Sequence, residues 1–487
     1  TLPSISATTL IPGFRFKNRS TPAPSTRSMA CKAQTNGRIY LHSGPRTELH
    51  EIIRREYARH QDRAVPRNTL RQAVQGMLDT FAYQNFDAAA GEYTNRCCRP
   101  PRETEMRPWR LVTEIGWTGG GVLAYPLVLC RDALGADAEA PLAAAMSGEQ
   151  LFDRIADAYN ENSGLLNDLM APNAAGSQVN GWWTGYGLVK DCHCAYTVGS
   201  AVHYLTKTMD YLHQNGKPCP AKWMDAAQKV LHTVMDLQRA DGAFGYTYST
   251  QERKVLDWSG FAGCWFAPAL VYLYRLTGEE RCLHSAEKAL DYYHTFVKDL
   301  NCYGTPMDTW KAVDEEGNLA FMRGSRLLYE QTGKAEFLQY MKDSAGYEFL
   351  WRYGYKTYPE HTPLNQGWSA CGGAVTSVSN PHIHPMGVII DTDLRYLARV
   401  TGDGYYASRA ADSAAWMLQC LELYPAATGY GRYGILSERW CPSDGLDVER
   451  FSDGRPFSSW FSHNLWASAC VLEAACELLL ESEHKKG

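Results

Sequence analysis

The segment Leu273-Tyr-Arg-Leu-Thr-Gly278 has two close variants further along the chain, at 328–333 (Leu-Tyr-Glu-Gln-Thr-Gly) and 397–402 (Leu-Ala-Arg-Val-Thr-Gly). Each copy ends an apolar stretch of helical period, and a second, Ala-rich helical stretch follows within a few residues. Glycine at the end of a helix supplies the left-handed conformation that stops it. A turn this short makes the next helix run antiparallel to the first. The repeat therefore predicts a series of helical hairpins.

Apolar residues recur at spacings of three and four from residue 46 onward, whereas strand-like alternation is nearly absent. This periodicity predicts twelve helices that alternate between inner and outer positions. The inner helices are the more apolar and the richer in Gly and Ala, so they can pack closely. Six hairpins, with the last closed against the first, form an all-α (α/α)6 toroid, also called a six-hairpin barrel. The predicted helices are 67–83, 111–133, 147–161, 195–215, 222–239, 258–277, 280–298, 317–332, 335–352, 384–401, 405–423 and 461–481.

Long segments lead into the inner helices, whereas the turns that leave these helices are mostly short. Six long loops at one end of a barrel predict a concave pocket there. These loops are 84–110, 162–194, 240–257, 299–316, 353–383 and 424–460. Residues 1–43 are rich in Ser, Thr, Pro and Arg and show no helical period. We interpret 1–43 as a short irregular linker or edge strand and 44–487 as the barrel domain.

The composition narrows the choice of partner. A net charge of -5, from 48 basic and 53 acidic residues spread along the chain, offers no field for nucleic acid or an anionic membrane. No apolar run is long enough to span a membrane. Aromatic residues make up 12%, and many of the 14 Trp and 29 Tyr lie in glycine-rich loops, where they suit the apolar faces of sugar rings. We expect a small-molecule carbohydrate as the partner. Whether the protein is a monomer or a homo-oligomer stays open.

The 15 cysteines are an odd number and are scattered through helices and loops, which is typical of reduced thiols. This usage favours the cytoplasm, or the periplasm if an N-terminal signal has been removed. Neither Asp191-Cys-His-Cys194 nor Cys97-Cys98 has the spacing of a zinc site. The chain also has no nucleotide-binding motif. We therefore expect neither a metal nor another cofactor.

Hydrolysis of a glycosidic bond needs one protonated and one ionised carboxyl group. Asp257 precedes Trp258, which is expected to raise the pKa of the carboxyl by desolvation and so make it the acid; an N-cap is the alternative. Glu438 lies beside Arg439 and close to Trp440, and the guanidinium would hold it ionised as the base. A surface ion pair is the alternative for Glu438.

Side chains in the same loops, or at the starts of inner helices, are candidates for binding the substrate. Trp182 and Trp183 are the leading platform for stacking on a sugar, because glycines surround them. Arg96 and other arginines in or beside these loops suit a uronate carboxylate. The remaining candidates are Asp191, His193, Trp258, Asp308, His382, His384, Asp391, Arg439, Trp440 and His463.

The helical repeat, together with the turn Leu237-Gln-Arg-Ala-Asp-Gly-Ala-Phe-Gly245, resembles the six-hairpin glycosidase superfamily over residues 46–487. That superfamily includes glucoamylases, unsaturated glucuronyl hydrolases and gut-bacterial exo-acting families. The resemblance implies a glycoside hydrolase of polysaccharide degradation, of the gut-bacterial exo-acting and β-glucuronidase-like type. In glucoamylases the acid lies in the loop that enters the third inner helix and the base in the loop that enters the sixth. These loops correspond here to 240–257 and 424–460.

Two other activities occur on similar toroids. Epimerases of the acylglucosamine 2-epimerase kind use two histidines, and here Pro381-His-Ile-His-Pro-Met-Gly387 and His463 enter the fifth and sixth inner helices. The Glu that follows the first histidine in those enzymes is missing, and Asp391 is the nearest acid. The second activity is that of polysaccharide lyases, which act on uronates. Lyases with a helical toroid usually continue into sheet domains. A purely structural repeat scaffold would not need six long aromatic loops.

Overall fold

A computed structural model describes most of the chain. The chain divides into two compact units, Thr1–Ser43 and Gly44–Gly487, and the described residues all belong to the second. They are residues 44, 48–60, 63–98, 107–110, 114–117, 119–169, 178–179, 181–183, 188–305, 311–357, 369–378, 380–421, 423, 434, 436–438, 440 and 461–484.

The three repeated Thr-Gly segments end helices as predicted. Gly278, Gly333 and Gly402 have φ of 72°, 65° and 70°, the left-handed conformation that terminates α8, α10 and α12. A second helix, α9, α11 or α13, begins two residues after each glycine. The bounds of these three hairpins are α8 (Phe266–Thr277) with α9 (Glu280–Lys298), α10 (Glu316–Thr332) with α11 (Ala335–Trp351), and α12 (Asp391–Thr401) with α13 (Gly404–Cys420).

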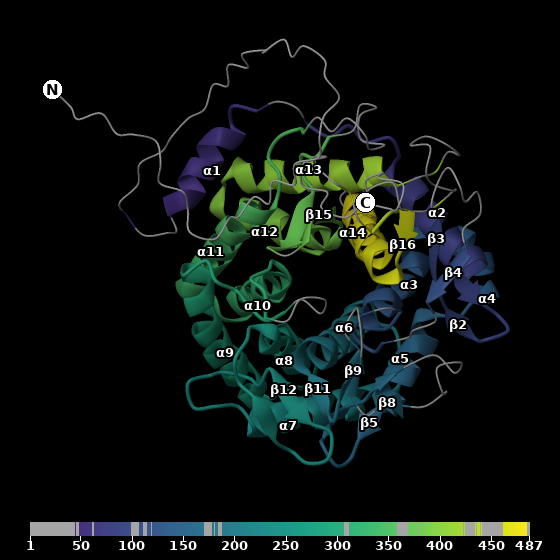
Figure 1. Ribbon diagram of the computed structural model, residues 1–487, viewed down its shortest axis with the longest axis vertical. Helices are drawn as coiled ribbons and strands as arrows, with labels where there is room; N and C mark the ends of the chain where they lie inside the picture. Colours follow the sequence, from purple (N-terminus) through teal and green to yellow (C-terminus); the bar gives the residue numbers. More distant parts are fainter. Residues whose placement is uncertain are drawn as a thin grey trace, which may run out of the picture. The chain divides into compact units, whose positions relative to one another are not determined.

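Six inner helices form a closed ring in the second unit (Figure 1). Along this ring α3 contacts α6, α6 contacts α8, and α8 contacts α10. α10 in turn contacts α12 and the short helix η7 that precedes α12. The last inner helix, α14, packs against η7 and α12 on one side and against α3 on the other, so it closes the ring. The bounds not yet given are α3 (Gly121–Leu134), α6 (Ala195–Gln214), η7 (Met386–Ile390) and α14 (Leu465–His484).

Each inner helix is covered by an outer one. α2 packs on α14, α5 on α3, α7 on α6, α9 on α8, α11 on α10 and α13 on α12. The all-α (α/α)6 architecture predicted from the sequence is confirmed. The remaining helices are α1 (Leu49–Tyr57), α2 (Leu70–Thr80), the π-helical turn η2 (Phe81–Asn85), η3 (Gly135–Ala138), α4 (Glu139–Ala144), α5 (Gly148–Asp157), α7 (Ala221–Asp236) and η5 (Ala262–Trp265).

Small residues allow the inner helices to approach one another. A Cβ placed on Gly199 of α6 would lie 2.8 Å from the Trp265 Cβ, and one on Gly121 of α3 would lie 3.0 Å from the Tyr204 Cβ. The prediction of close packing by glycine is confirmed at both contacts. α3 begins later than predicted, because a tight turn precedes it: a Cβ on Gly120 would lie 1.9 Å from the Glu114 carbonyl oxygen.

Short antiparallel strands, which the periodicity did not predict, lie in the segments that lead into the inner helices (Figure 1). Three-stranded sheets have the orders β16-β3-β4 and β11-β12-β13, and β14 pairs with β15. The strands are β1 (Phe86–Asp87), β2 (Glu92–Tyr93), β3 (Asn95–Cys98), β4 (Arg107–Arg110), β5 (Tyr159–Asn160), β6 (Leu165–Leu166), β7 (Asp168–Leu169), β8 (Gln178–Val179), β9 (Gly181–Trp183), β10 (Leu188–Lys190), β11 (Cys192–Cys194), β12 (Thr247–Ser249), β13 (Val255–Asp257), β14 (Ala374–Ser377), β15 (Asn380–His384) and β16 (Phe461–His463).

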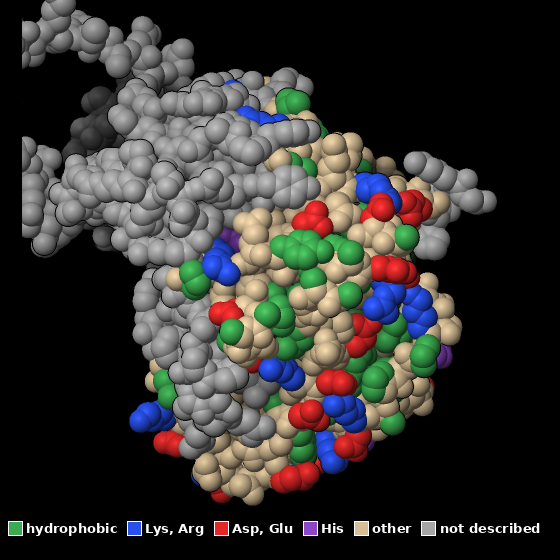
Figure 2. Space-filling model, turned by 90° about the vertical axis from the view of Figure 1, so that its right-hand side faces the viewer, with side chains coloured by type: hydrophobic (Ala, Val, Ile, Leu, Met, Phe, Trp, Pro, Cys, Tyr) green, Lys and Arg blue, Asp and Glu red, His purple; other side chains and the backbone are tan. Residues whose placement is uncertain are grey.

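The described surface mixes the two signs of charge. On the face shown in Figure 2, acidic and basic side chains are interspersed, and apolar atoms lie between them. Among the helices that are described, none is long and apolar enough to cross a membrane.

Candidate functional site

The amino-terminal ends of the inner helices bring together aromatic rings, a histidine and carboxylates. Ring contacts connect three of these ends. Trp466, in the first turn of α14, stacks on Trp117, which precedes α3, with ring centres 6.0 Å apart. On the same indole stacks His384, the last residue of β15, at 5.9 Å. Trp466 and His384 are buried, so Trp117, which is half-buried, is the ring of this stack that is open enough to meet a sugar.

Glu438 joins this stack. The indole Nε1 of Trp466 donates a hydrogen bond of 3.2 Å to the Glu438 Oε1. The His384 Nδ1 donates to the His382 carbonyl oxygen at 3.0 Å, which fixes the orientation of the ring. His382 itself is buried. Predicted residues Glu438 and His384 therefore contact the same indole.

A carboxylate that the sequence analysis did not select, Glu316, lies at the same end of the barrel. It is the first residue of α10 and is half-buried. Burial raises the pKa of Tyr196 in α6 well above its ordinary value, and the charge of Glu316 and a hydrogen bond with it raise that pKa further. Burial also raises the pKa of Cys470 in α14, and Glu473 and Glu316 add to this effect. Glu316 therefore faces two other inner helices.

Two buried acids precede Glu316. Asp314 accepts hydrogen bonds of 3.2 Å from the backbone N–H groups of Thr305 and Gly317. Burial raises the pKa of Asp314 well above its ordinary value, and the charge of Glu316 raises it further. Burial likewise raises the pKa of Glu315, followed by the charge of Glu348. Of the three consecutive acids, only Glu316 is open enough to meet a substrate.

The surroundings of Asp257 favour the ionised carboxylate and not the protonated acid that the sequence analysis predicts. It ends β13, and Lys311 donates to its Oδ2 at 2.6 Å while the Ser259 N–H donates to its Oδ1 at 2.8 Å. Burial opposes ionisation of Asp257, but these hydrogen bonds outweigh burial and lower its pKa. The expectation of a raised pKa is therefore wrong. The Arg239 guanidinium lies over the Trp258 ring, 5.1 Å from the ring centre. A cation therefore occupies one face of Trp258.

Several predicted binding residues are buried in ways that argue against a direct contact with substrate. Trp182 is only 1% exposed and so offers no open face for stacking. His193 is equally buried, its Nε2 lies 2.9 Å from the Ser163 Oγ, and burial lowers its pKa to about 4. Asp391 is buried against Arg352, which donates to its Oδ1 at 3.0 Å.

His463 is also a structural residue. Its Nε2 lies 3.0 Å from the Asn85 Oδ1, and its Nδ1 lies 3.0 Å from the Ser468 Oγ and 3.1 Å from the Leu436 carbonyl oxygen. Burial lowers its pKa to about 4. A ring held on both nitrogens by protein groups is poorly placed to exchange a proton with a sugar.

The other candidates take varied positions. Asp191 is exposed at a turn with φ of 59°, and Trp440 is buried, with its backbone paired to Ile383. The Trp183 backbone belongs to β9, but its side chain lies outside the described residues, as do Asp308 and Arg439. Among the described residues, no group of three or more His, Cys, Asp and Glu side chains could hold a metal ion.

Sequence reasoning passed over Glu316, although this residue ends the predicted loop 299–316; in the structure it begins α10. A signal was available in Asp314-Glu315-Glu316, because three adjacent acids at the start of an inner helix point toward the same end of the barrel as the loops. Trp117 and Trp466 were missed because they lie inside the predicted helices 111–133 and 461–481. Both are close to the start of an inner helix and carry no mark in the sequence that distinguishes them from core residues.

Comparisons with known proteins agree with this fold. No family model and no curated protein sequence matches the chain. Among solved structures, a glycoside hydrolase family 76 mannosidase, Bt3792 from Bacteroides thetaiotaomicron VPI-5482, matches 85% of this chain and 99% of its own, with a TM-score of 0.52 and 14% identity. The cellobiose 2-epimerase from Spirochaeta thermophila DSM 6192 matches 91% and 100%, with a TM-score of 0.53 and 13% identity. A sugar epimerase from a ruminal bacterium matches 85% and 98%, with a TM-score of 0.53 and 11% identity.

Identities this low establish the fold alone. The predicted resemblance to six-hairpin glycosidases is confirmed at that level, since the matched structures include both hydrolases and epimerases with the same toroid. The chain thus shares the toroid of the mannosidase and the two epimerases that it matches.

Proposed function

We propose that the protein is a glycoside hydrolase that works at the amino-terminal end of its inner helices. The observation that carries this proposal is the placing of two carboxylates against one face of α14. Glu438 is bonded to Trp466, and Glu316 acts on Cys470, which is one helical turn further along. Residues four apart lie on the same helix face, and one turn advances about 5.4 Å.

Two carboxylates that act on residues of one helix suit hydrolysis. Glycosidases place their two carboxyl groups roughly 5–9.5 Å apart, on either side of the bond that is cleaved. The half-buried ring of Trp117 stacks on Trp466 at the same end of the barrel and would hold a sugar by its apolar face. Asp257 stays the alternative partner of Glu438, and its low pKa suits a base or nucleophile and not an acid.

A uronic acid is the substrate class that we propose. Arg96 of β3 lies opposite His463 of β16 in their sheet, next to the start of α14. Its Nε is buried without a hydrogen-bond acceptor among the described residues, and burial lowers its pKa. A guanidinium in this state favours an anionic ligand such as a uronate carboxylate.

A histidine-based epimerase is supported less well. Such a mechanism needs two histidines that can exchange protons with the sugar. His384 contacts the aromatic stack, but His463 is buried and held by Asn85, Ser468 and Leu436.

The test is an assay of three variants with aryl glycosides, including an aryl glucuronide. We expect Glu438→Gln and Glu316→Gln each to lower kcat by at least about a hundredfold, with folding checked by circular dichroism. If Asp257→Asn abolishes activity while Glu316→Gln keeps it, the second carboxylate is Asp257. Free sugars and uronate polymers are tested in parallel. Epimer formation, or absorbance from a new double bond, without aryl release would contradict the hydrolase proposal.

A further inference from the structure

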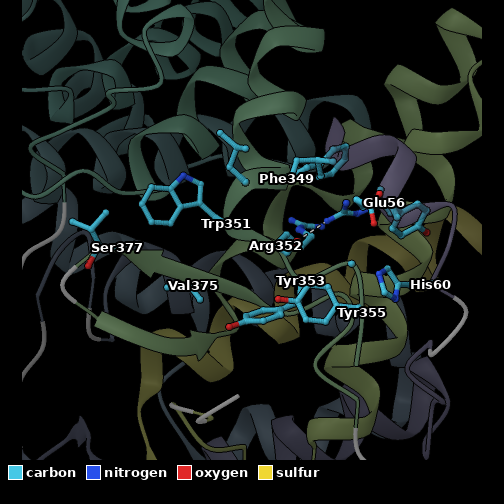
Figure 3. Close-up of a pocket in the computed structure, with 15 residues that line it drawn as sticks. Glu56, His60, Phe349, Trp351, Arg352, Tyr353, Tyr355, Val375 and Ser377 are labelled. Carbon is cyan, nitrogen blue, oxygen red and sulfur yellow. Dashed lines mark hydrogen bonds between the residues drawn. The ribbon is translucent and has the colours of Figure 1, made fainter. Parts of the chain in front are cut away.

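A cavity lies outside the ring of inner helices, between α1, the carboxyl-terminal end of α11, β14 and α13. Its volume is about 640 Å³, within the range of small-molecule sites. The wall is largely aromatic (Figure 3). The residues that matter for the argument are Tyr57, His60, Trp351, Tyr353, Tyr355 and Arg409.

The rings form an aromatic wall that is open to solvent. Tyr355 lies 5.4 Å from Tyr353 and 5.6 Å from His60 between ring centres. The side chain of Tyr355 is 45% exposed, and Val378 at the edge of the cavity is 67% exposed. Figure 3 shows Tyr353 and Tyr355 side by side, with His60 beyond them. Exposed aromatic faces inside a cavity suit a flat or chair-shaped ring.

Arg409 gives this aromatic cavity a positive charge. Its side chain is fully buried and lies 4.2 Å from the Phe349 ring centre and 4.8 Å from that of Tyr57. It donates to the Tyr405 hydroxyl at 3.3 Å and to the Arg352 carbonyl oxygen at 2.7 Å. Its Nε has no acceptor, and none of the described carboxylates bonds to it. Burial lowers its pKa, and the charge of Arg352 lowers it further.

The neighbouring arginines are different, because each holds a carboxylate. Arg352 is bonded to Glu348 at 2.7 Å and to Asp391 at 3.0 Å. Arg54 pairs with Asp403. A buried charge without a counter-ion is costly, so proteins rarely keep one. An anion in the cavity would supply the counter-charge that Arg409 lacks.

We infer that this cavity is an accessory binding site for a small anionic ring compound, a six-membered ring that bears a carboxylate. The ring would stack on Tyr355 and meet Tyr353 edge to face, because the two tyrosine rings are at 70° to each other, and the carboxylate would lie toward Arg409. The cavity is separate from the barrel mouth, which is the end of the ring where the inner helices begin, because the β14–β15 hairpin lies between the two. Val375 lines the cavity, whereas Ala374, the adjacent residue of the strand, pairs with His384. Successive residues of a strand point to opposite faces, so the hairpin presents one face to each site.

The test measures binding by calorimetry and by tryptophan fluorescence, with sodium glucuronate and sodium benzoate as probes and glucose as the neutral control. We expect glucuronate, benzoate or both to bind, and glucose to bind at least tenfold more weakly. Glucuronate alone indicates a sugar acid as the natural ligand, and benzoate alone indicates an aromatic acid. Val378→Asp adds a negative charge at the rim, and Tyr355→Ala removes an exposed ring; each should weaken binding at least tenfold.

Matched controls are substitutions at exposed residues outside the cavity. Tyr83→Ala and Leu256→Asp change side chains that are 58% and 51% exposed and should leave binding unchanged. Glu438→Gln alters the barrel mouth. Binding that is lost in Glu438→Gln but kept in Val378→Asp would assign the ligand to the barrel mouth and overturn the inference. Equal binding of glucose, or no binding of either acid, would also overturn it.

Discussion

Lys311 controls the ionisation of Asp257. Its ammonium is 2.6 Å from the Asp257 Oδ2, and the carboxyl is about one third exposed, so the interaction is partly screened. Because the folded-state pKa of Asp257 is lowered, the charged form is stabilised above the ordinary pKa, and that stabilisation is lost as the pH falls through the lowered value.

The prediction at this residue is a change in pH dependence. Lys311→Met removes the main hydrogen bond that lowers the Asp257 pKa but leaves the burial that raises it. If Asp257 takes part as an ionised group, the acidic limb of the kcat/KM profile should move to higher pH, with kcat at high pH largely kept. The profile is measured with an aryl glycoside, and Lys334→Met, at the exposed Glu287 pair, is the control. An unmoved limb would exclude Asp257 from the essential groups.

At the scale of elements, the helical hairpin turns show a glycine requirement that is purely conformational. Gly278, Gly333 and Gly402 have positive φ, and a Cβ on any of them would meet no atom within 4 Å. Side-chain clashes therefore do not explain the glycine. The reason is the left-handed backbone, which costs a residue with a Cβ about 1–2 kcal/mol.

We predict that Gly333→Ala lowers the free energy of unfolding by about 1 kcal/mol, and that Gly333→Asn lowers it less, because Asn tolerates this conformation better. Gly404 is the matched control. It begins α13, its φ is not positive, and a Cβ there would also meet no atom within 4 Å. Gly404→Ala should therefore raise stability, by at most about 1 kcal/mol. Denaturant unfolding measures all three, and equal effects at 333 and 404 would disprove the explanation.

The helices could be predicted because their signals are local. Periodicity and the Thr-Gly caps give α9 and α11 almost to the residue. The capping box of Ser147 and Gln150 at the start of α5 is a local signal of the same kind. The short strands were not, since residues 192–194 pair with residues 247–249 and such pairing depends on the closed ring.

The candidate site was harder to predict, because burial is a property of the assembled barrel. The sequence presents Trp182, His193 and His463 as polar or aromatic residues near loops, yet each is buried once the segments pack. Conversely, Glu316 was only the last residue of the predicted loop 299–316, yet in the structure it begins α10 and is half-buried, not buried as Asp314 and Glu315 are. The sequence places acids at the end of the barrel that carries the long loops, but which of them meet depends on the assembled ring.

For the whole molecule, closure of the ring depends on α14. In the middle of the barrel, Lys207 of α6 is bonded to Glu473 and lies 2.7 Å from Glu477, both on α14. The Tyr204 hydroxyl donates to Glu473 at 2.7 Å. Lys207, Tyr204 and Glu473 are buried and Glu477 is half-buried, so each charge depends on a partner that is at least 266 residues away in the sequence. An open solenoid has no such dependence, because each of its repeats contacts only its neighbours.

The final prediction separates a closed ring from an open stack of repeats. Deleting 465–487 removes α14, exposes the apolar faces of α2 and α3, and leaves Lys207 without its carboxylates. We expect the shortened protein to lose its cooperative thermal transition, because the buried charge and the open seam each cost several kcal/mol, against a total stability of about 5–15 kcal/mol. Deleting 1–43, which we propose to lie outside the barrel domain, should shift Tm little. Calorimetry compares both deletions with the full chain. A cooperative transition within a few degrees of the full-length Tm after loss of α14 would show that the barrel does not need closure.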